Sequence, residues 1–308
     1  MIVYLSEFIH PEAVAKLSEN VKVVNNFDEI EKIDAIIMRG INVTREMMEK
    51  ATNLKVIAKH GVGTNTIDIQ AAKELGIKVI YTPTANINSV AELIVGLIIN
   101  LNRDICLANK NSREGVYKTI APPELIGLEV KGKTLGLVGM GNIAKIVANI
   151  LIKGFDVKVV GYDPYITSEK ALEAGINKFD DLIEMLRVSD FVNVSVPLTN
   201  STRNLISGDM FDYFKPNAIL INAARGGVVN EDDLYEALVN KKLKAAACDA
   251  FVNEPPTVQN CKLLSLDNFI ATPHIGGNTQ EALYRAGMEV VEETLNVLSG
   301  KEPIHPAY

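Results

Sequence analysis

Short apolar runs recur along the chain between longer segments of helical pattern. Most are continuous stretches of Val, Ile, Leu and Ala rather than alternating ones. They lie at 2–5, 35–38, 55–58, 78–81, 134–138, 157–161, 191–196, 218–222, 245–248 and 269–272. Strands that are covered on both faces have this character, and they occur in parallel sheets flanked by helices. The alternation therefore predicts an α/β fold built from βα repeats.

The order of these repeats predicts two domains, as does the length of 308 residues. One βα series occupies residues 1 to 98. A long helical stretch at 89–113 then leads into a polar, proline-containing segment at 118–132, and a second series starts at Lys133. Helical patterns also lie at 231–240, after an Asn230 cap, and at 280–298.

Composition excludes several classes of protein. The hydrophobic fraction of 47% supports buried cores, and the 31 Lys and Arg residues are scattered in a chain of net charge −7, so nucleic acid is not an expected partner. Three cysteines without a CxxC pair predict free thiols in a reducing compartment and no metal site. Residues 1–10 lack signal-peptide features, and the most apolar helical run, 91–101, is too short to cross a bilayer. We expect a soluble cytoplasmic protein without a membrane partner.

A glycine-rich turn is the strongest local motif. The sequence 139–144, Gly-Met-Gly-Asn-Ile-Ala, follows a strand and opens a helix. In this G-x-G-x-x-A pattern Gly139 permits the tight turn, Gly141 lets a pyrophosphate approach, and Ala144 lets the helix pack closely. Alone, the pattern also fits an ordinary strand-to-helix turn. The next strand ends in Asp163, 22 residues after Gly141 (163 − 141). A carboxylate there binds ribose hydroxyls and repels a 2′-phosphate, which predicts NAD rather than NADP.

Three later strands each end in a polar group. Arg225 follows the run at 218–222, Asp249 and Glu254 follow 245–248, and His274 follows 269–272. Ligands bind beyond the carboxyl ends of the strands in open α/β sheets, so these groups are expected to share one site.

The chemistry of these groups is complementary. Histidine exchanges protons near neutral pH, a neighbouring carboxylate orients it, and arginine binds a substrate carboxylate or polarises a keto oxygen. Each residue alone also fits a solvated or hydrogen-bonded loop position. Together they favour a catalytic site that reduces a 2-keto acid.

At this point the sequence resembles the D-isomer-specific 2-hydroxyacid dehydrogenase family, particularly its phosphoglycerate dehydrogenase-like branch. The resemblance covers nearly the whole chain. The motifs that carry it are KHGVGTNTID at 59–68, NINSVAE at 86–92, the glycine turn, SVPLT at 195–199, STR at 201–203 and the three segments above.

The resemblance implies an architecture. A Rossmann-type NAD-binding domain at 99–284 is inserted into a flavodoxin-like substrate (catalytic) domain formed by 1–98 and 285–308. The long helix after Ser89 is expected to help form a homodimer.

The resemblance also implies residue roles. His274 exchanges the proton with support from Glu254, and Arg225 binds substrate. Asp249 with Ala223 and Ala224 should hold the nicotinamide carboxamide, and Val196 and Pro197 should line the adenine side. The expected substrate-binding residues are Lys59, Val62, Gly63, Arg225 and His274. The expected cofactor-binding residues are Gly139, Gly141, Asn142, Ile143, Asp163, Val196, Pro197, Ala223, Ala224, Arg225, Asp249, His274, Gly276 and Gly277.

Two residues depart from the family pattern: the first removes a charged contact with a phosphate of the cofactor, and the second leaves the substrate open. Asn142 stands where many relatives carry Arg, and Lys59 stands where phosphoglycerate-specific members often have Arg, although lysine still offers a point charge. His60 is either a specificity element or a solvent-facing loop residue. We expect an NAD-dependent D-2-hydroxyacid dehydrogenase acting on 3-phosphoglycerate or on a glyoxylate, hydroxypyruvate or sulfolactate-type acid. The alternatives are an NAD-sensing, corepressor-like regulatory module on the same fold and a hydride transferase acting on formate or phosphite.

Overall fold

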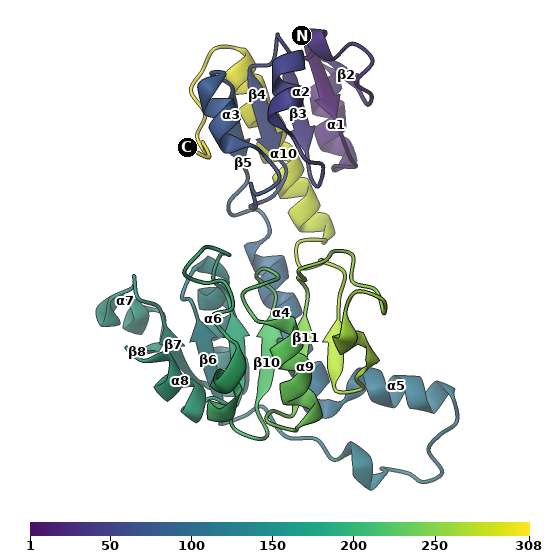
Figure 1. The fold of residues 1–308 in the computed structure, drawn as a ribbon, viewed down its shortest axis with the longest axis vertical. Helices are drawn as coiled ribbons and strands as arrows, with labels where there is room; N and C mark the ends of the chain where they lie inside the picture. Colours follow the sequence, from purple (N-terminus) through teal and green to yellow (C-terminus); the bar gives the residue numbers. More distant parts are fainter. The chain divides into compact units, whose positions relative to one another are not determined.

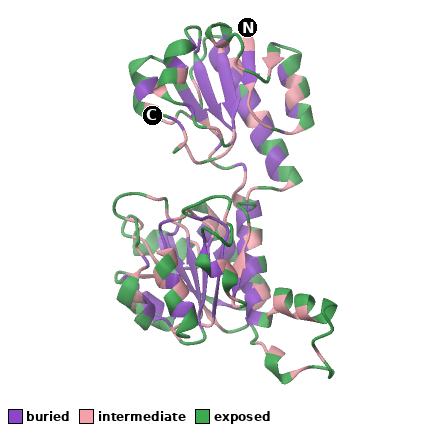
Figure 2. Ribbon diagram, turned by 45° about the vertical axis from the view of Figure 1, so that its right-hand side comes forward, coloured by how far each residue is buried: buried purple, intermediate pink, exposed green.

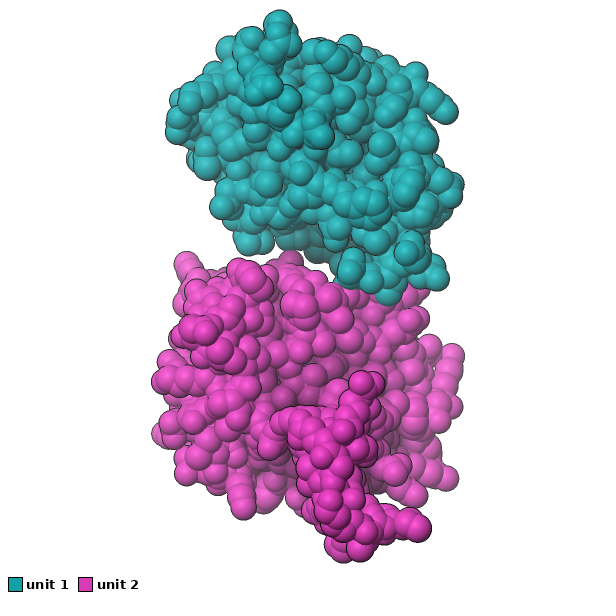
Figure 3. All heavy atoms as spheres, turned by 90° about the vertical axis from the view of Figure 1, so that its right-hand side faces the viewer, with its two compact units in different colours: residues 1–86, 277–308 teal, residues 87–276 magenta.

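The computed structural model describes all 308 residues and divides into two compact units (Figure 3). Unit 1 comprises Met1–Asn86 and Gly277–Tyr308, and unit 2 comprises Ile87–Gly276. Both divisions lie earlier in the chain than the boundaries expected after residues 98 and 284. The reason is helix packing. Helix α4 (Ile87–Arg103) packs on α6 and on strands of unit 2, and α10 (Gln280–Leu298) packs on strands of unit 1.

Unit 1 is a parallel sheet of five strands in the order β2-β1-β3-β4-β5 (Figure 1). This is the flavodoxin-like order that the resemblance implies. The strands are β1 (Ile2–Leu5), β2 (Lys22–Val24), β3 (Ala35–Met38), β4 (Val56–Lys59) and β5 (Lys78–Tyr81). The helices are α1 (Pro11–Ser18), α2 (Arg45–Lys50), α3 (Ile69–Glu74) and α10, with a short 3-10 turn η1 (Ile30–Lys32).

Both faces of this sheet are buried, which explains the continuous apolar strands (Figure 2). One core joins the sheet to α1 and α10 through residues such as Val3, Leu17 and Val291. The C-terminal segment also covers the edge strand β5. Pro306 forms an antiparallel bridge with Ile80, and the Tyr81 N–H donates to the His305 carbonyl at 3.3 Å.

Unit 2 is a parallel sheet of seven strands in the order β12-β11-β10-β9-β6-β7-β8, the Rossmann arrangement with one further strand. Its strands are β6 (Thr134–Val138), β7 (Lys158–Tyr162), β8 (Asn177–Phe179), β9 (Phe191–Val194), β10 (Ile219–Asn222), β11 (Ala245–Cys248) and β12 (Phe269–Ala271). Its α-helices are α4, α5 (Ile105–Arg113), α6 (Asn142–Phe155), α7 (Ser168–Glu173), α8 (Leu182–Val188) and α9 (Glu231–Val239). Its 3-10 turns are η2 (Pro123–Leu125), η3 (Gly208–Tyr213) and η4 (Lys262–Ser265).

The prediction of a single long helix at 89–113 is wrong, because this segment forms two helices, α4 and α5, separated at Asp104. Asp104 has a left-handed backbone (φ 50°), which ends α4. Lys244 stabilises the break, since its Nζ donates to the carbonyls of Leu101 (3.1 Å) and Asn102 (3.4 Å), which α4 leaves free. Beyond the break, α5 extends from the body of unit 2 (Figure 1) and has no buried residue. None of the helices combines the length and apolarity that a membrane span requires.

Candidate active site

The glycine turn between β6 and α6 has the shape that a dinucleotide needs. Gly139 has φ +90°, and a Cβ there would lie 2.6 Å from Val196 Cγ1 and 2.7 Å from the Ser195 carbonyl oxygen, so only glycine fits. A Cβ on Gly141 would meet no atom within 4 Å, so the space beside this backbone is open. No side chain caps α6, whose first N–H groups are therefore available to a phosphate. These residues fit the pyrophosphate of a dinucleotide.

Asp163 follows β7 and lies beside the same turn. Its Oδ2 accepts the Met140 N–H and its Oδ1 accepts the Tyr165 N–H, both at 2.9 Å. One bond to each oxygen leaves lone pairs for ribose hydroxyls, because a carboxylate can accept about four hydrogen bonds. Asp163 thus both supports the glycine turn and remains able to bind a nucleotide.

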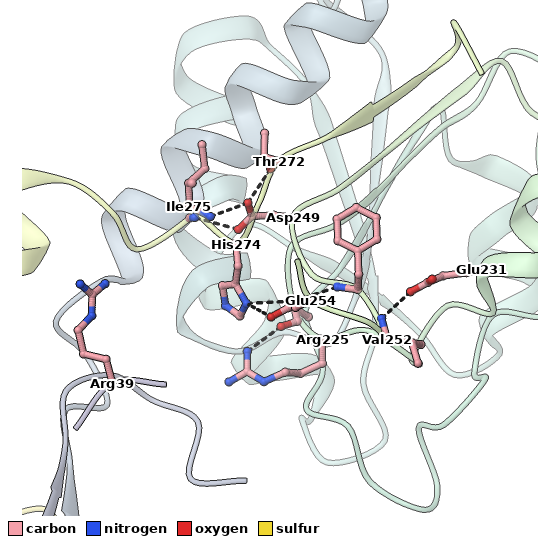
Figure 4. A network of polar contacts seen from close by, with 12 residues as sticks. Arg39, Arg225, Glu231, Asp249, Val252, Glu254, Thr272, His274 and Ile275 are labelled. Atoms are coloured by element: carbon pink, nitrogen blue, oxygen red, sulfur yellow. Dashed lines mark hydrogen bonds and ion pairs between the residues drawn. The ribbon is translucent and has the colours of Figure 1, made fainter. Parts of the chain in front are cut away.

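His274 and Glu254 form a hydrogen-bonded pair beyond strands β12 and β11 (Figure 4). The imidazole Nδ1 lies 2.9 Å from Glu254 Oε2 and 3.1 Å from Oε1. Glu254 Oε1 also accepts the Phe251 N–H at 3.0 Å, which fixes the carboxylate on its own loop. Half of the His274 side-chain surface is exposed, so Nε2 is the ring nitrogen left to face a ligand. This arrangement can hold the imidazole in one orientation while it exchanges a proton.

Arg225 lies on the loop after β10, beside the pair (Figure 4). Asn222 shapes this loop, because its side chain donates to the Arg225 carbonyl at 3.0 Å and accepts the Ala224 N–H at 3.2 Å. Burial lowers the pKa of the Arg225 guanidinium, and the Glu254 carboxylate opposes this shift. The guanidinium nevertheless stays charged, because the ordinary pKa of arginine lies far above neutral pH. Its Nη1 donates to the Ala224 carbonyl at 2.7 Å, and its other donors can bind an anion.

Asp249 anchors the loop that carries His274. Only 2% of Asp249 is exposed. Its Oδ1 accepts the Thr272 hydroxyl (2.6 Å) and the Ile275 N–H (2.8 Å), and its Oδ2 accepts the Gly276 N–H (2.8 Å). These bonds hold His274 in a left-handed conformation (φ 55°), which costs a residue with a Cβ about 1–2 kcal/mol. The contact that Asp249 is expected to make with a nicotinamide carboxamide stays a prediction.

The other expected cofactor residues of unit 2 follow the same sheet edge. Val196 and Pro197 come directly after β9, where Val196 contacts the glycine turn. Asn142 and Ile143 begin α6, and Ala223 and Ala224 lie with Arg225 on the loop after β10. Gly277 is the first residue of the returning segment of unit 1.

The expected substrate residues Lys59, Val62 and Gly63 belong to unit 1, at the end of β4 and in the loop beyond it. Lys59 is 8% exposed, and its Nζ donates to the Arg39 carbonyl. His60 is also 8% exposed, which excludes the solvent-facing alternative. Burial, followed by the charge of Arg39, lowers the pKa of His60 to about 4. His60 is therefore neutral at physiological pH.

Three residues that contact the loops of the site were not predicted from the sequence: Asn222, Glu231 and Thr272. Asn222 and Thr272 stand at strand ends, so the strand-end rule that selected Arg225 and His274 also applies to them. Glu231 Oε1 accepts the Val252 N–H at 2.7 Å (Figure 4). In the sequence it is one of three acidic residues in the first turn of a helix, which is an ordinary position for an acid.

Comparison with known proteins places the chain in a family. Residues 95–276 match the model of the D-isomer specific 2-hydroxyacid dehydrogenase, NAD binding domain. The chain belongs to the D-isomer specific 2-hydroxyacid dehydrogenase family. This match confirms the family and the NAD-binding domain that the motifs predict, and the two parallel sheets confirm the fold class.

Individual members of the family resemble the chain over most of its length. It is 41% identical to a hydroxypyruvate reductase of Thermotoga maritima, covering 94% of this chain and 93% of the relative. It is 40% identical to a D-3-phosphoglycerate dehydrogenase of Methanocaldococcus jannaschii over 97% of this chain, which spans 58% of that relative's length. A Thermus thermophilus protein of solved structure superposes with a TM-score of 0.93 at 31% identity, covering 100% of both chains.

Proposed function

We propose that this chain is an NAD-dependent D-2-hydroxyacid dehydrogenase. The observation that carries the proposal is the 2.9 Å contact between His274, on the loop after β12, and Glu254, on the loop after β11. The Arg225 guanidinium lies beside this pair on the loop after β10 (Figure 4). The glycine turn with Asp163 lies at the same edge of the same sheet and supports NAD as cofactor.

The residues of unit 2 divide the work of reducing a 2-keto acid. NADH, when bound, supplies the hydride for the keto carbon. The imidazolium of His274 gives its Nε2 proton to the oxygen of that carbon, so the product is a hydroxyl group. The Glu254 carboxylate accepts a hydrogen bond from His274 Nδ1, which orients the imidazole, and its negative charge stabilises the imidazolium form. Arg225 binds the substrate carboxylate or polarises the keto oxygen. In the oxidation direction His274 takes the proton back.

The family indicates the substrate class, and the individual substrate is part of the proposal. We propose small 2-keto acids and their D-2-hydroxy products, with 3-phosphohydroxypyruvate, hydroxypyruvate, glyoxylate and sulfopyruvate as the acids to compare. Lys59 at the end of β4, whose ammonium group donates to the Arg39 carbonyl, and the neutral, buried His60 that follows it stand at the start of the loop expected to set the choice among these acids.

The test is oxidation of NADH with each of these four acids, followed by oxidation of both enantiomers of the preferred hydroxy acid. We expect turnover with at least one acid, reaction of the D enantiomer alone, and loss of about two or more decades of kcat in His274→Ala with NADH binding retained. NADH binding without turnover on any acid would instead favour the regulatory, NAD-sensing alternative.

We also propose that the protein is a cytoplasmic homodimer. The projecting segment that begins with α5 (Figure 1) exposes four large apolar side chains, which indicates an interface. They are Ile105, Val116, Ile120 and Ile126, which are 48%, 51%, 99% and 79% exposed. A second copy of the chain is the partner that the family resemblance implies. The three cysteines are all free, and Cys106 is exposed, which suits a reducing compartment.

A further inference from the structure

The peptide bond between Phe251 and Val252 lies between the loop of Arg225 and the carboxylate of Glu254. A Cβ on Gly226 would lie 2.0 Å from the Phe251 carbonyl carbon and 2.3 Å from the Val252 nitrogen. The two loops therefore touch backbone to backbone, and no side chain fits between them. Because Glu254 also bonds the Phe251 N–H, we expect a shift of this peptide to move Glu254 relative to Arg225.

Two carboxylates hold this peptide segment from its N–H side. Glu254 Oε1 accepts the Phe251 N–H at 3.0 Å, and Glu231 Oε1 accepts the Val252 N–H at 2.7 Å (Figure 4). Hydrogen bonds to charged acceptors are about twice as strong as neutral ones. Glu231 reaches the peptide from the first turn of α9. A different residue, Asn230, caps the N-terminus of this helix, because its side chain accepts the Asp233 N–H at 3.0 Å. Glu231 is thus not needed as the helix cap.

The surroundings of Glu231 differ from those of its neighbours in that turn. Burial raises the pKa of Glu231, and the nearby carboxylates of Asp232 and Glu254 add to the rise. Asp232, by contrast, has a side chain that is 79% exposed and pairs with Lys262 at the surface. Burying a carboxylate near two others is unfavourable unless it makes a strong contact, and the Val252 N–H is that contact.

We propose that Glu231 is a positioning residue, which holds the Phe251–Val252 peptide against Gly226 and so fixes Glu254 and His274 relative to Arg225. Glu231 does not touch the imidazole or the guanidinium, so it acts only through the backbone of the Glu254 loop. Its contribution to turnover rests on the proposed function, whereas its contribution to the His274–Glu254 hydrogen bond does not.

Four single substitutions separate this role from others. Glu231→Ala removes the acceptor, and Glu231→Asp keeps the charge at the helix N-terminus but is one methylene too short. Glu231→Gln keeps an oxygen at the right length. Asp232→Ala is the matched control, because it removes one carboxylate from the same helical turn without touching the peptide.

We expect Glu231→Ala and Glu231→Asp to lower kcat by about tenfold to a hundredfold, since misplacing a catalytic group by 1 Å can cost about a hundredfold. The Kd for NADH should change little. Glu231→Gln should stay within about threefold of the wild type, and Asp232→Ala should match it. Equal losses in Glu231→Gln and Glu231→Ala would overturn the role of the acceptor oxygen, as would normal kcat in Glu231→Asp.

The imidazole ¹⁵N chemical shifts of His274 provide a readout that needs no activity. The chain has only four histidines, so His274 is assignable by comparison with His274→Ala. We expect Glu231→Asp to move its Nδ1 signal toward that of Glu254→Gln, and Asp232→Ala to leave it in place. An unmoved Nδ1 signal in Glu231→Asp would refute the positioning role even if no keto acid proved to be a substrate.

Discussion

Replacing Asp249 with Asn tests how the catalytic loop is held. The substitution keeps the size of the side chain but turns one acceptor oxygen into an NH₂ donor. In one orientation of the amide, the NH₂ group faces the Gly276 N–H, 2.8 Å from the original oxygen. In the other orientation it faces the Ile275 N–H, also at 2.8 Å. At least one backbone N–H therefore loses its acceptor in either case.

The magnitude follows from the burial of this site. Asp249 is 2% exposed, so water does not replace the lost acceptor. A hydrogen bond to a charged group contributes about 1.5–3 kcal/mol. We expect the free energy of unfolding of unit 2 to fall by this amount. For a domain of this size the melting temperature falls by about 2–4 °C for each kcal/mol, which gives a decrease of about 3–12 °C.

Calorimetry and steady-state kinetics measure the two consequences. The melting temperature of Asp249→Asn should fall, and its kcat should drop by about tenfold or more because His274 sits on the loosened loop. Asp267→Asn is the control, since Asp267 is 73% exposed and only pairs with Lys110 at the surface. A melting temperature within about 1 °C of the wild type, together with unchanged kcat, would show that these hydrogen bonds do not hold the loop.

Three further predictions concern the cofactor, the pH dependence and the oligomer. Asp163→Ala should weaken the preference for NADH over NADPH, and an unchanged ratio of the two kcat/KM values would remove Asp163 from the ribose site. The pKa of His60 is about 4 in the folded state and near 6.5 when unfolded, so the unfolded chain binds more protons between these values. Unit 1 should lose up to about 3 kcal/mol as the pH falls from 6.5 to 4, and His60→Gln should lack this component in urea titrations. Replacing Ile120 and Ile126 with Asp should convert a dimer to a monomer in light scattering, and an unchanged mass would exclude this segment from the interface.

Sequence patterns predicted the strands that are buried on both faces. The ranges 35–38, 78–81 and 134–138 match β3, β5 and β6 residue for residue. The edge strands β2 and β8 were missed, because each has three residues, begins with an exposed polar one and has no fully buried position. The break at Asp104 was also missed, because Lys244, which stabilises it, is distant in the chain.

The site was predictable to the extent that parallel strands bring their carboxyl ends together. Arg225, Glu254 and His274 were found by that rule, and the structure brings their loops side by side. The contacts that fix them were not predictable, because they depend on the fold of the loops. Asp249 and Glu231 accept backbone N–H groups of other loops, and Asn222 bonds the backbone of its own loop. The sequence shows which side chains are present at a strand end, whereas the tertiary structure decides which backbone group each of them hydrogen-bonds.

The division of unit 1 into two segments has a consequence for synthesis. Strands β1 to β5 leave the ribosome first, but Val290 and Val291 of α10 complete the core on one face of their sheet. Between Asn86 and Gly277 lie 190 residues (277 − 86 − 1), which take about 10–40 s to translate at about 5–20 residues per second. Throughout that interval, while unit 2 is being synthesised, the nascent sheet of unit 1 presents an uncovered apolar face. Unit 1 therefore cannot complete its core until synthesis has passed through the whole of unit 2.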